Sequence, residues 1–286
     1  GKAINAGTYE ASVTVNGKVF TEEFTIAAKK VSVIIGEVQT VYGTAPDLSN
    51  VSYETDGAAV ADIASGITFR STISLVANVG TYANAIEGVY TGSVNYVVIF
   101  TNGTLRINKA RLDTSGIEFE DSVVTYDGKK HAVIPSSLPE GLTATVSYYT
   151  AANGWSYDID GVVAAGTYTV TVSLVLDASI AGNYEPVSGM TGTLVIKKAA
   201  LTVTAVNNAI TYGDAPSAHE DGVAITGFVN GEDESVLKGR LEYGFNYNVG
   251  GSAGTYSITP SGLRADNYEI TFKSGVLTVN KRVVTI

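Results

Sequence analysis

The sequence predicts an all-β fold, built from tandem β-sandwich modules of immunoglobulin-like type in an elongated array. Two observations carry this prediction: apolar and polar residues alternate locally, and a Gly-Thr-Tyr motif recurs along the chain. Alternation with a period of two buries one face of a strand and exposes the other. The motif occurs four times, at Gly7-Thr8-Tyr9, Gly80-Thr81-Tyr82, Gly166-Thr167-Tyr168 and Gly254-Thr255-Tyr256.

Other landmarks keep the same order in each repeat. A Tyr-Gly turn comes before Gly-Thr-Tyr, and an Asn-Tyr pair and a short strand ending in lysine come after it. The Asn-Tyr pairs are Asn95-Tyr96, Asn183-Tyr184 and Asn267-Tyr268. These landmarks predict the C-terminal part of a repeat at 1–30, complete repeats at 31–109, 110–198 and 199–281, and the first strand of a following repeat at 282–286. Short joints between repeats favour a semi-rigid string.

Individual strands and turns follow from the local pattern. The runs 11–15, 168–174 and 268–272 alternate apolar with polar residues, and Asn16-Gly17 predicts a hairpin with a type I′ turn. Acidic residues within 230–237 predict a short helix, so a β-grasp-like module with one short helix is the alternative fold. In each motif we expect glycine to make a bend and tyrosine to place its ring in the core, with its hydroxyl on a backbone partner as in a tyrosine corner. The structural residues are then Gly80, Tyr82, Gly166, Tyr168, Gly254 and Tyr256.

Composition excludes several functional classes. The chain has no cysteine, which excludes disulfides, thiol nucleophiles and thiolate metal sites. Its formal net charge is −10, and an acidic surface repels nucleic acid and anionic lipid. No apolar run is long enough to insert this segment into a membrane.

The order of the motifs resembles the MBG (mostly-β, glycine-rich) and YDG repeats of large bacterial surface proteins. The last repeat is similar to MBG through Ile210–Pro216, Gly227–Asp233 and Ala265–Tyr268, and the middle repeat is similar to YDG through Tyr126–His131. Residues 31–109 resemble MBG more loosely. The resemblance implies an extracellular, bacterial cell-surface location, a role in the stalk of an adhesin-like protein, and no catalytic residues or cofactor.

The candidate catalytic motifs favour a protein that is not an enzyme. Gly250–Gly254 has the Gly-x-Ser-x-Gly spacing of a nucleophile elbow, but it leads into a strand and lacks a histidine partner. His131 and His219 lie in different repeats. Lysines that could form isopeptide crosslinks lie at the ends of repeats, where no core asparagine and acid would meet them. The recurring lysines are Lys109, Lys198 and Lys281.

Two weak ligand sites remain. Trp155 is the only tryptophan, and nearby Tyr148, Tyr149 and Tyr157 could stack with it on the face of a sugar; the alternative is that these rings pack the core or flank a hairpin. Asp158 and Asp160 are two residues apart and could open a calcium loop, but the other ligands of such a loop are missing, so we expect a solvated turn.

The sequence therefore predicts a stalk or spacer that displays a head domain away from the envelope. The alternative is a module that binds glycan or a host surface protein through the region around Trp155. We expect neighbouring repeats of the same chain to be the main partners. Because unpaired strand edges recruit strands, we also expect head-to-tail strand pairing through 1–30 and 282–286.

Overall fold

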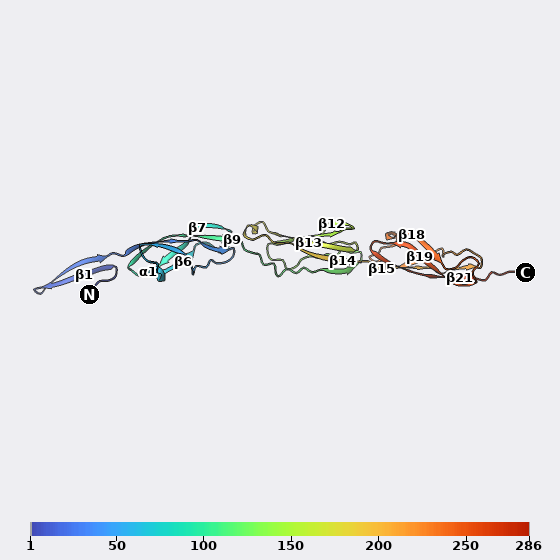
Figure 1. The fold of residues 1–286 in the computed structure, drawn as a ribbon, viewed down its shortest axis with the longest axis horizontal. Helices are drawn as coiled ribbons and strands as arrows, with labels where there is room; N and C mark the ends of the chain where they lie inside the picture. The colour runs from blue at the N-terminus through green and yellow to red at the C-terminus, as the bar shows by residue number, and fades with distance from the viewer. Residues whose placement is uncertain (1, 286) are drawn as a thin grey trace. The chain divides into compact units, whose positions relative to one another are not determined.

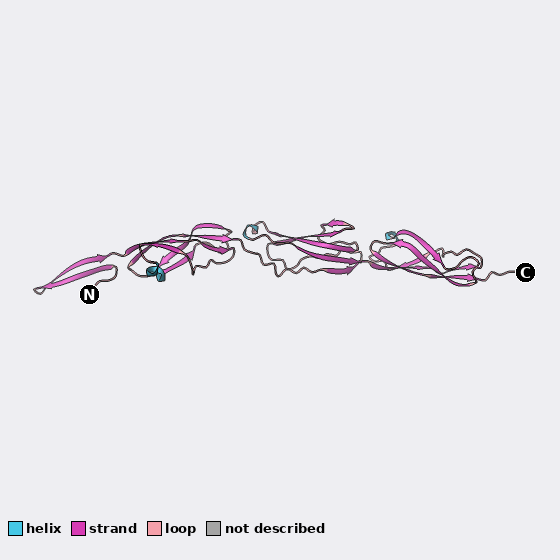
Figure 2. Cartoon of the chain, in the orientation of Figure 1, coloured by secondary structure: helices cyan, strands magenta, loops and turns pink. Residues whose placement is uncertain are grey.

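The computed structural model describes residues 2–285, and nearly all of their regular structure is β-strand (Figures 1 and 2). The chain divides into two compact units. One unit contains the residues up to Asp113 together with Leu176–Val187, and the other contains Thr114–Val175 and the residues from Ser188 onward. A loop of the middle repeat thus belongs to the same unit as the repeat before it. No helix in residues 2–285 is long and apolar enough to cross a membrane.

The first unit starts with a two-stranded hairpin, followed by seven strands in two sheets. The hairpin turn has φ of 51° at Asn16 and 77° at Gly17, as the Asn-Gly pair predicts. One sheet has the order β5-β3-β8 and the other β4-β9-β7-β6. The elements are β1 (Gly7–Val15), β2 (Lys18–Ile26), β3 (Lys29–Ile35), β4 (Val38–Val41), β5 (Tyr53–Asp56), α1 (Val60–Ile63), η1 (Ala64–Gly66), β6 (Ile67–Ser71), β7 (Gly80–Tyr90), β8 (Tyr96–Thr101), β9 (Gly103–Asn108) and η2 (Ala181–Asn183).

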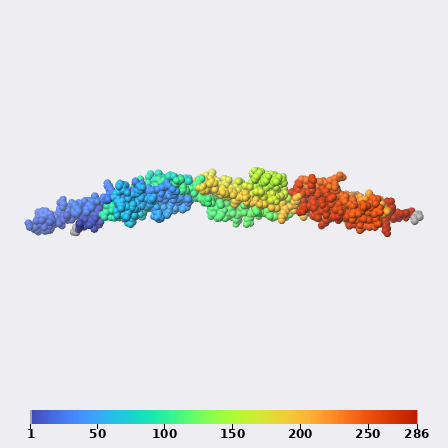
Figure 3. Space-filling view, in the orientation of Figure 1, coloured from blue at the N-terminus to red at the C-terminus, as the bar shows by residue number. Residues whose placement is uncertain are grey.

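The hairpin contains the same strand pair as a complete repeat. Its Gly7 is opposite Ile26 and its Tyr9 is opposite Phe24, just as Gly80 is opposite Ile107 in the next repeat. Most side chains of the hairpin lie at the surface (Figure 3). In the complete repeat, alternate residues of β3 are buried between the two sheets, as the period of two predicts.

The second unit contains the middle and last repeats. The middle repeat has one five-stranded sheet, β10-β14-β13-β11-β12, and the last has two sheets, β17-β15-β20 and β16-β21-β19-β18. The elements are β10 (Ser122–Thr125), β11 (Leu142–Thr150), β12 (Gly154–Ser156), β13 (Gly166–Leu176), β14 (Met190–Lys197), β15 (Ala199–Ala205), β16 (Asn208–Thr211), β17 (Val223–Thr226), η3 (Glu234–Val236), β18 (Lys238–Phe245), β19 (Gly254–Arg264), β20 (Tyr268–Lys273) and β21 (Gly275–Asn280).

The prediction of tandem, all-β sandwich modules is confirmed. The first complete repeat and the last repeat have the same topology, in which the first strand pairs in parallel with the strand that follows Asn-Tyr. The helix expected within 230–237 is only the three-residue turn η3, and α1 has four residues. Neither is long enough to cover a sheet, which argues against the β-grasp alternative. Residues 282–285 form no strand, and Ile286 of the predicted 282–286 strand lies outside the described residues.

Candidate functional site

Each Gly-Thr-Tyr motif forms the same corner. The tyrosine hydroxyl donates to the carbonyl oxygen of the residue four positions earlier, which ties the start of the strand to the loop before it. The distances are 2.9 Å from Tyr9 to Asn5, 2.7 Å from Tyr82 to Asn78, 2.8 Å from Tyr168 to Ala164 and 2.8 Å from Tyr256 to Ser252. Tyr168 lies in the core, whereas the other three rings are half-buried. Gly80, Gly166 and Gly254 do not have positive φ, so the expected bend does not need glycine for that reason.

An asparagine of the following repeat contacts three of these corners. Its side-chain Oδ1 accepts the backbone N–H of the residue just before the motif glycine. The distances are 2.6 Å from Ala6 N to Asn95, 2.9 Å from Val79 N to Asn183 and 2.9 Å from Ala165 N to Asn267. We call this contact the asparagine latch and the region around it a joint.

The latch and the corner hold one and the same peptide unit. Within the peptide that links Asn78 to Val79, the carbonyl accepts from Tyr82 of its own repeat and the N–H donates to Asn183 of the next. The same arrangement holds the peptides 5–6 and 164–165. Both polar groups of the peptide are therefore satisfied, one by each repeat, which fixes the orientation of the loop.

The latch asparagine is also tied to its own repeat. Its backbone carbonyl accepts the N–H of a residue close to the start of that repeat, at 2.8 Å for Lys29 and Asn95, 3.0 Å for Ala110 and Asn183, and 2.9 Å for Ala199 and Asn267. In the first two joints its amide nitrogen donates to a further asparagine side chain, at 3.1 Å for Asn95 and Asn5 and 2.9 Å for Asn183 and Asn78. In the third joint that position is Ala164, and the Asn267 side chain lies beside the Tyr126 hydroxyl, where it acts to lower the pKa of that group.

A pair of tyrosines lies beside the latch in two joints. Tyr42 of one Tyr-Gly turn meets Tyr184 edge to face, with ring centroids 5.5 Å apart and an angle of 76° between the rings. Tyr126 meets Tyr268 with the same separation and an angle of 77°. Such edge-to-face contacts stabilise beyond the area that the rings bury. In these two joints the asparagine of the Asn-Tyr pair therefore contacts the tyrosine corner of the preceding repeat, and the tyrosine of the pair contacts its Tyr-Gly turn.

The joint at Asn267 has an additional carboxylate. Glu232 accepts the Tyr126 hydroxyl at 2.5 Å with one oxygen and the Tyr268 hydroxyl with the other. Burial raises the pKa of Tyr126 to about 12, and the neighbouring carboxylate contributes to this shift. Burial and Glu232 also raise the pKa of Tyr268. The neighbouring Asp233, rather than Glu232, caps the turn η3 by accepting from Ser235 N at 2.9 Å.

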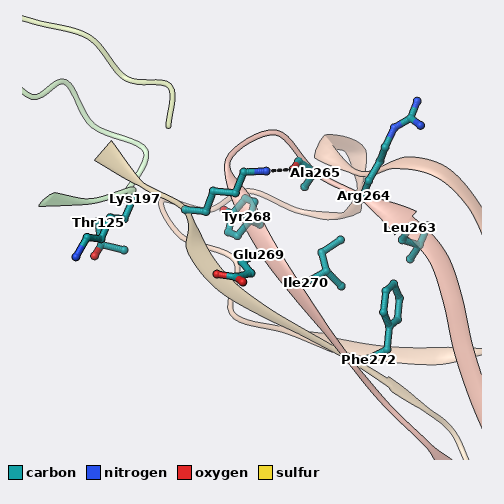
Figure 4. Close-up of a pocket in the computed structure, with 10 residues that line it drawn as sticks. Thr125, Lys197, Leu263, Arg264, Ala265, Tyr268, Glu269, Ile270 and Phe272 are labelled. Carbon is teal, nitrogen blue, oxygen red and sulfur yellow. Dashed lines mark hydrogen bonds between the residues drawn. The ribbon is translucent and has the colours of Figure 1, made fainter. Parts of the chain in front are cut away.

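A cavity of about 740 Å³ lies beside this joint (Figure 4). Its lining includes basic and acidic side chains, but they do not form a convergent set. Lys198 donates to the carbonyl oxygen of Ala265 at 3.1 Å, and the guanidinium of Arg264 points away from Glu269 and Tyr268 (Figure 4). The chemistry at the joint is hydrogen bonding and ring packing, which positions neighbouring repeats.

Of the four predicted aromatic residues, three are exposed and one is buried. Tyr149, Trp155 and Tyr157 are exposed by 40%, 53% and 75%, and their rings are in contact along the edge of the middle sheet. The ring centroids are 4.9 Å apart for Tyr149 and Trp155 and 6.1 Å apart for Trp155 and Tyr157. Tyr148 must be removed from the predicted set, because it is fully buried and its hydroxyl pairs with the backbone of Val133.

The other candidates have ordinary partners. Lys130 forms ion pairs with both Asp158 and Asp160, so an ammonium group lies where a cation would have been expected. His131 lies 2.8 Å from Asp127. In residues 2–285, no group of three or more histidine, aspartate or glutamate residues is arranged to hold a metal ion.

The latch was not predicted from the sequence, although its two parts recur there. Asn-Tyr recurs in every complete repeat, and a small or β-branched residue precedes every Gly-Thr-Tyr. The latch joins residues 89 to 104 positions apart, so no local pattern connects the asparagine of one repeat with the corner of the repeat before it. Glu232 gave no comparable signal, because only the last repeat has it at this place.

Comparisons with known proteins found distant solved structures and one family model. No curated protein matches the chain. Among solved structures, Drosophila N-cadherin EC1-4 is 8% identical, with 96% of this chain and 83% of that chain covered and a TM-score of 0.25. The Sidekick-1 immunoglobulin domains 1–5 are 13% identical, with 97% and 67% covered and a TM-score of 0.25. TM-scores this low give no information about function.

One family model matches part of the chain. Residues 201–278 match the MBG domain (YGX type), which is the family that Ile210–Pro216 resembles in the sequence. The match covers nearly all of the last repeat, including its Tyr212-Gly213 turn and its Gly254-Thr-Tyr256 corner. The last repeat of this chain is therefore similar to the MBG domain of the YGX type.

Proposed function

We propose that this chain is a non-catalytic spacer of a bacterial surface or secreted protein. Joints between its repeats would set the distance between a head domain and the envelope. The observation that supports this proposal is the asparagine latch, which occurs in the same form at Asn95, Asn183 and Asn267. A ligand-binding module needs no such repetition, whereas a spacer gains stiffness from every joint. The extracellular location is supported by the resemblance to surface-protein repeats and by the MBG match.

Small-angle X-ray scattering of a monomeric sample tests the spacer. A compact globule of this length has a radius of gyration of about 19 Å. Three extended modules, each roughly 35–40 Å long from ordinary strand lengths, give about 35 Å. We expect the larger value, and a value near 19 Å would overturn the proposal.

A double variant, Asn183→Ala with Asn267→Ala, tests whether the latches make the array stiff. We expect the repeats to stay folded, as judged by circular dichroism, while the scattering broadens to an ensemble of shapes. The matched control is Asn50→Ala, since the Asn50 side chain is exposed and donates a hydrogen bond to its neighbour Ser49. Unchanged scattering for the double variant would show that the latches do not set the stiffness.

A second candidate function rests on the ring cluster of Tyr149, Trp155 and Tyr157. Three exposed aromatic rings in contact, with Trp155 on the edge strand β12, offer flat apolar faces on which a sugar ring can stack. Trp155 is the only tryptophan, so its fluorescence reports on this cluster alone. Titration with neutral oligosaccharides should change the fluorescence saturably if this function is correct.

The control for this test lies on the same sheet. Val123 is exposed by 59% on β10, at the opposite edge from β12. Binding measured by calorimetry should be lost in Trp155→Ala and retained in Val123→Ala. No binding across a broad glycan array would remove the second candidate without affecting the spacer proposal.

A further inference from the structure

One of the four tyrosine corners has no latch. In the last repeat, the Tyr256 hydroxyl donates to the carbonyl of Ser252 at 2.8 Å, as in the other corners. The other half of that peptide unit is the N–H of Ala253, which has no hydrogen-bond partner within residues 2–285. Ala253 is exposed, whereas its counterparts Ala6, Val79 and Ala165 are half-buried and bonded to asparagine.

The tyrosine that would complete a joint is also in place. Tyr212 follows β16, and its N–H donates to Asn280 O at 2.8 Å. Tyr42 and Tyr126 make the same backbone bond in their repeats, at 2.9 Å to Asn108 and 2.8 Å to Lys197. The ring of Tyr212 is 43% exposed, whereas Tyr126, which packs on Tyr268, is 4% exposed. Tyr212 therefore offers the ring face that the other two use.

We propose that the Ser252–Ala253 peptide and the Tyr212 ring form a docking surface for the Asn-Tyr pair of a further β-module. The asparagine Oδ1 of that module would accept the Ala253 N–H, and its tyrosine would pack edge to face on Tyr212. This inference rests on the proposed function, because it treats the joint as the unit from which the spacer is built.

The occupant is a module joined directly to this repeat, rather than a separate protein. In all three latched joints the asparagine belongs to the repeat that follows along the chain. One side-chain hydrogen bond and one ring contact make a small interface, and a covalent connection supplies the effective concentration that so few contacts need. The spacing supports this choice, since Lys198 follows Leu194 by the same number of residues as Lys281 follows Leu277, and both leucines lie opposite a corner tyrosine.

The test extends the chain by one repeat. A copy of residues 199–281 replaces the residues after Lys281, so that Lys281 is followed by alanine as Lys198 is. Amide hydrogen exchange of Ala253 is then measured by NMR in the original and extended chains. We expect exchange at Ala253 to slow by about tenfold or more in the extended chain, since protection follows from forming the hydrogen bond.

The matched control is the same extension with Asn267→Ala in the appended copy only. It should leave exchange at Ala253 as fast as in the original chain, while Ala165, bonded to the original Asn267, stays protected throughout. Protection of Ala253 in both extensions would show that burial, not the latch, is responsible, and equal exchange in all three chains would show that no joint forms; either result overturns the inference. The scattering of the original chain is independent of this measurement, so a failure here is distinct from failure of the spacer proposal.

Discussion

The joints at Asn183 and Asn267 share a geometry but differ in what surrounds it. Both have a latch of 2.9 Å and a tyrosine pair at 5.5 Å. At Asn267, the Glu232 carboxylate accepts hydrogen bonds from both tyrosine hydroxyls. Tyr268 also belongs to a hydrophobic core that contains buried residues of both repeats. At Asn183, the tyrosine Tyr184 is only half-buried and is not a member of the core of the preceding repeat.

The geometry of a joint and its stability therefore depend on different residues. The latch and the tyrosine pair recur, so they account for the geometry that the joints have in common. Among the joints in residues 2–285, the carboxylate and the shared core occur only at Asn267, so we expect additional stability there. The latch at Asn183 can therefore hold a loop of one repeat on the repeat before it without making both repeats unfold together, whereas a shared core couples their unfolding.

We expect the largest difference in the free energy of unfolding between variants of Tyr268 and Tyr184, the tyrosines of the two Asn-Tyr pairs. Tyr268→Ala removes a buried ring from the shared core, and such changes cost about 3–5 kcal/mol in the free energy of unfolding. Tyr184→Ala removes a half-buried ring, for which we expect a loss of about 1–2 kcal/mol. Urea unfolding of both variants measures the difference. Equal losses would contradict the view that only the Asn267 joint has a shared core.

A smaller effect is expected from the carboxylate. In Glu232→Gln one tyrosine hydroxyl keeps an acceptor, while the charge that strengthens both bonds is lost. Hydrogen bonds to charged groups contribute about 1.5–3 kcal/mol, so we expect a loss of about 1–2 kcal/mol. The control is Glu234→Gln, an exposed neighbour in the same turn, which should change stability by less than about 0.5 kcal/mol. If the two variants lost the same stability, the bridge between the tyrosines would contribute nothing.

The sequence predicted the parts of each joint but not the contacts between them. Alternation and the Asn16-Gly17 turn are local signals, and Tyr82 reaches a carbonyl only four residues away, so short-range reasoning was sufficient for strands, hairpin and corner. Asn183 and Val79 meet within one unit although they are 104 positions apart, and no local pattern encodes a contact at that separation. The burial of Tyr148 beside exposed Tyr149 follows from the alternation of a strand, but which of the two faces the core depends on the register of β11 and β12.

The last prediction concerns the titration of Tyr126 at alkaline pH. It again depends on Glu232, which is present at the Asn267 joint. The pKa of Tyr126 is raised from 10.0 to about 12, so the folded state resists losing this proton. Stability from this group is therefore complete below pH 10, and it falls as the pH rises from 10 through about 12. The phenolate absorbance of the folded chain, compared with that of Tyr126→Phe, measures the titration of this one hydroxyl.

Glu232→Gln then shows which cause of the shift is dominant. Burial is the largest cause and the carboxylate the second, so the pKa of Tyr126 should fall in this variant but remain above 10. A complete return to 10 would mean that the carboxylate alone raises the pKa, and that the hydroxyl is solvated once the charge is removed. In that case the joint would be held closed by Glu232 rather than by the core around Tyr268, and the stability difference between the two joints would depend on a single side chain.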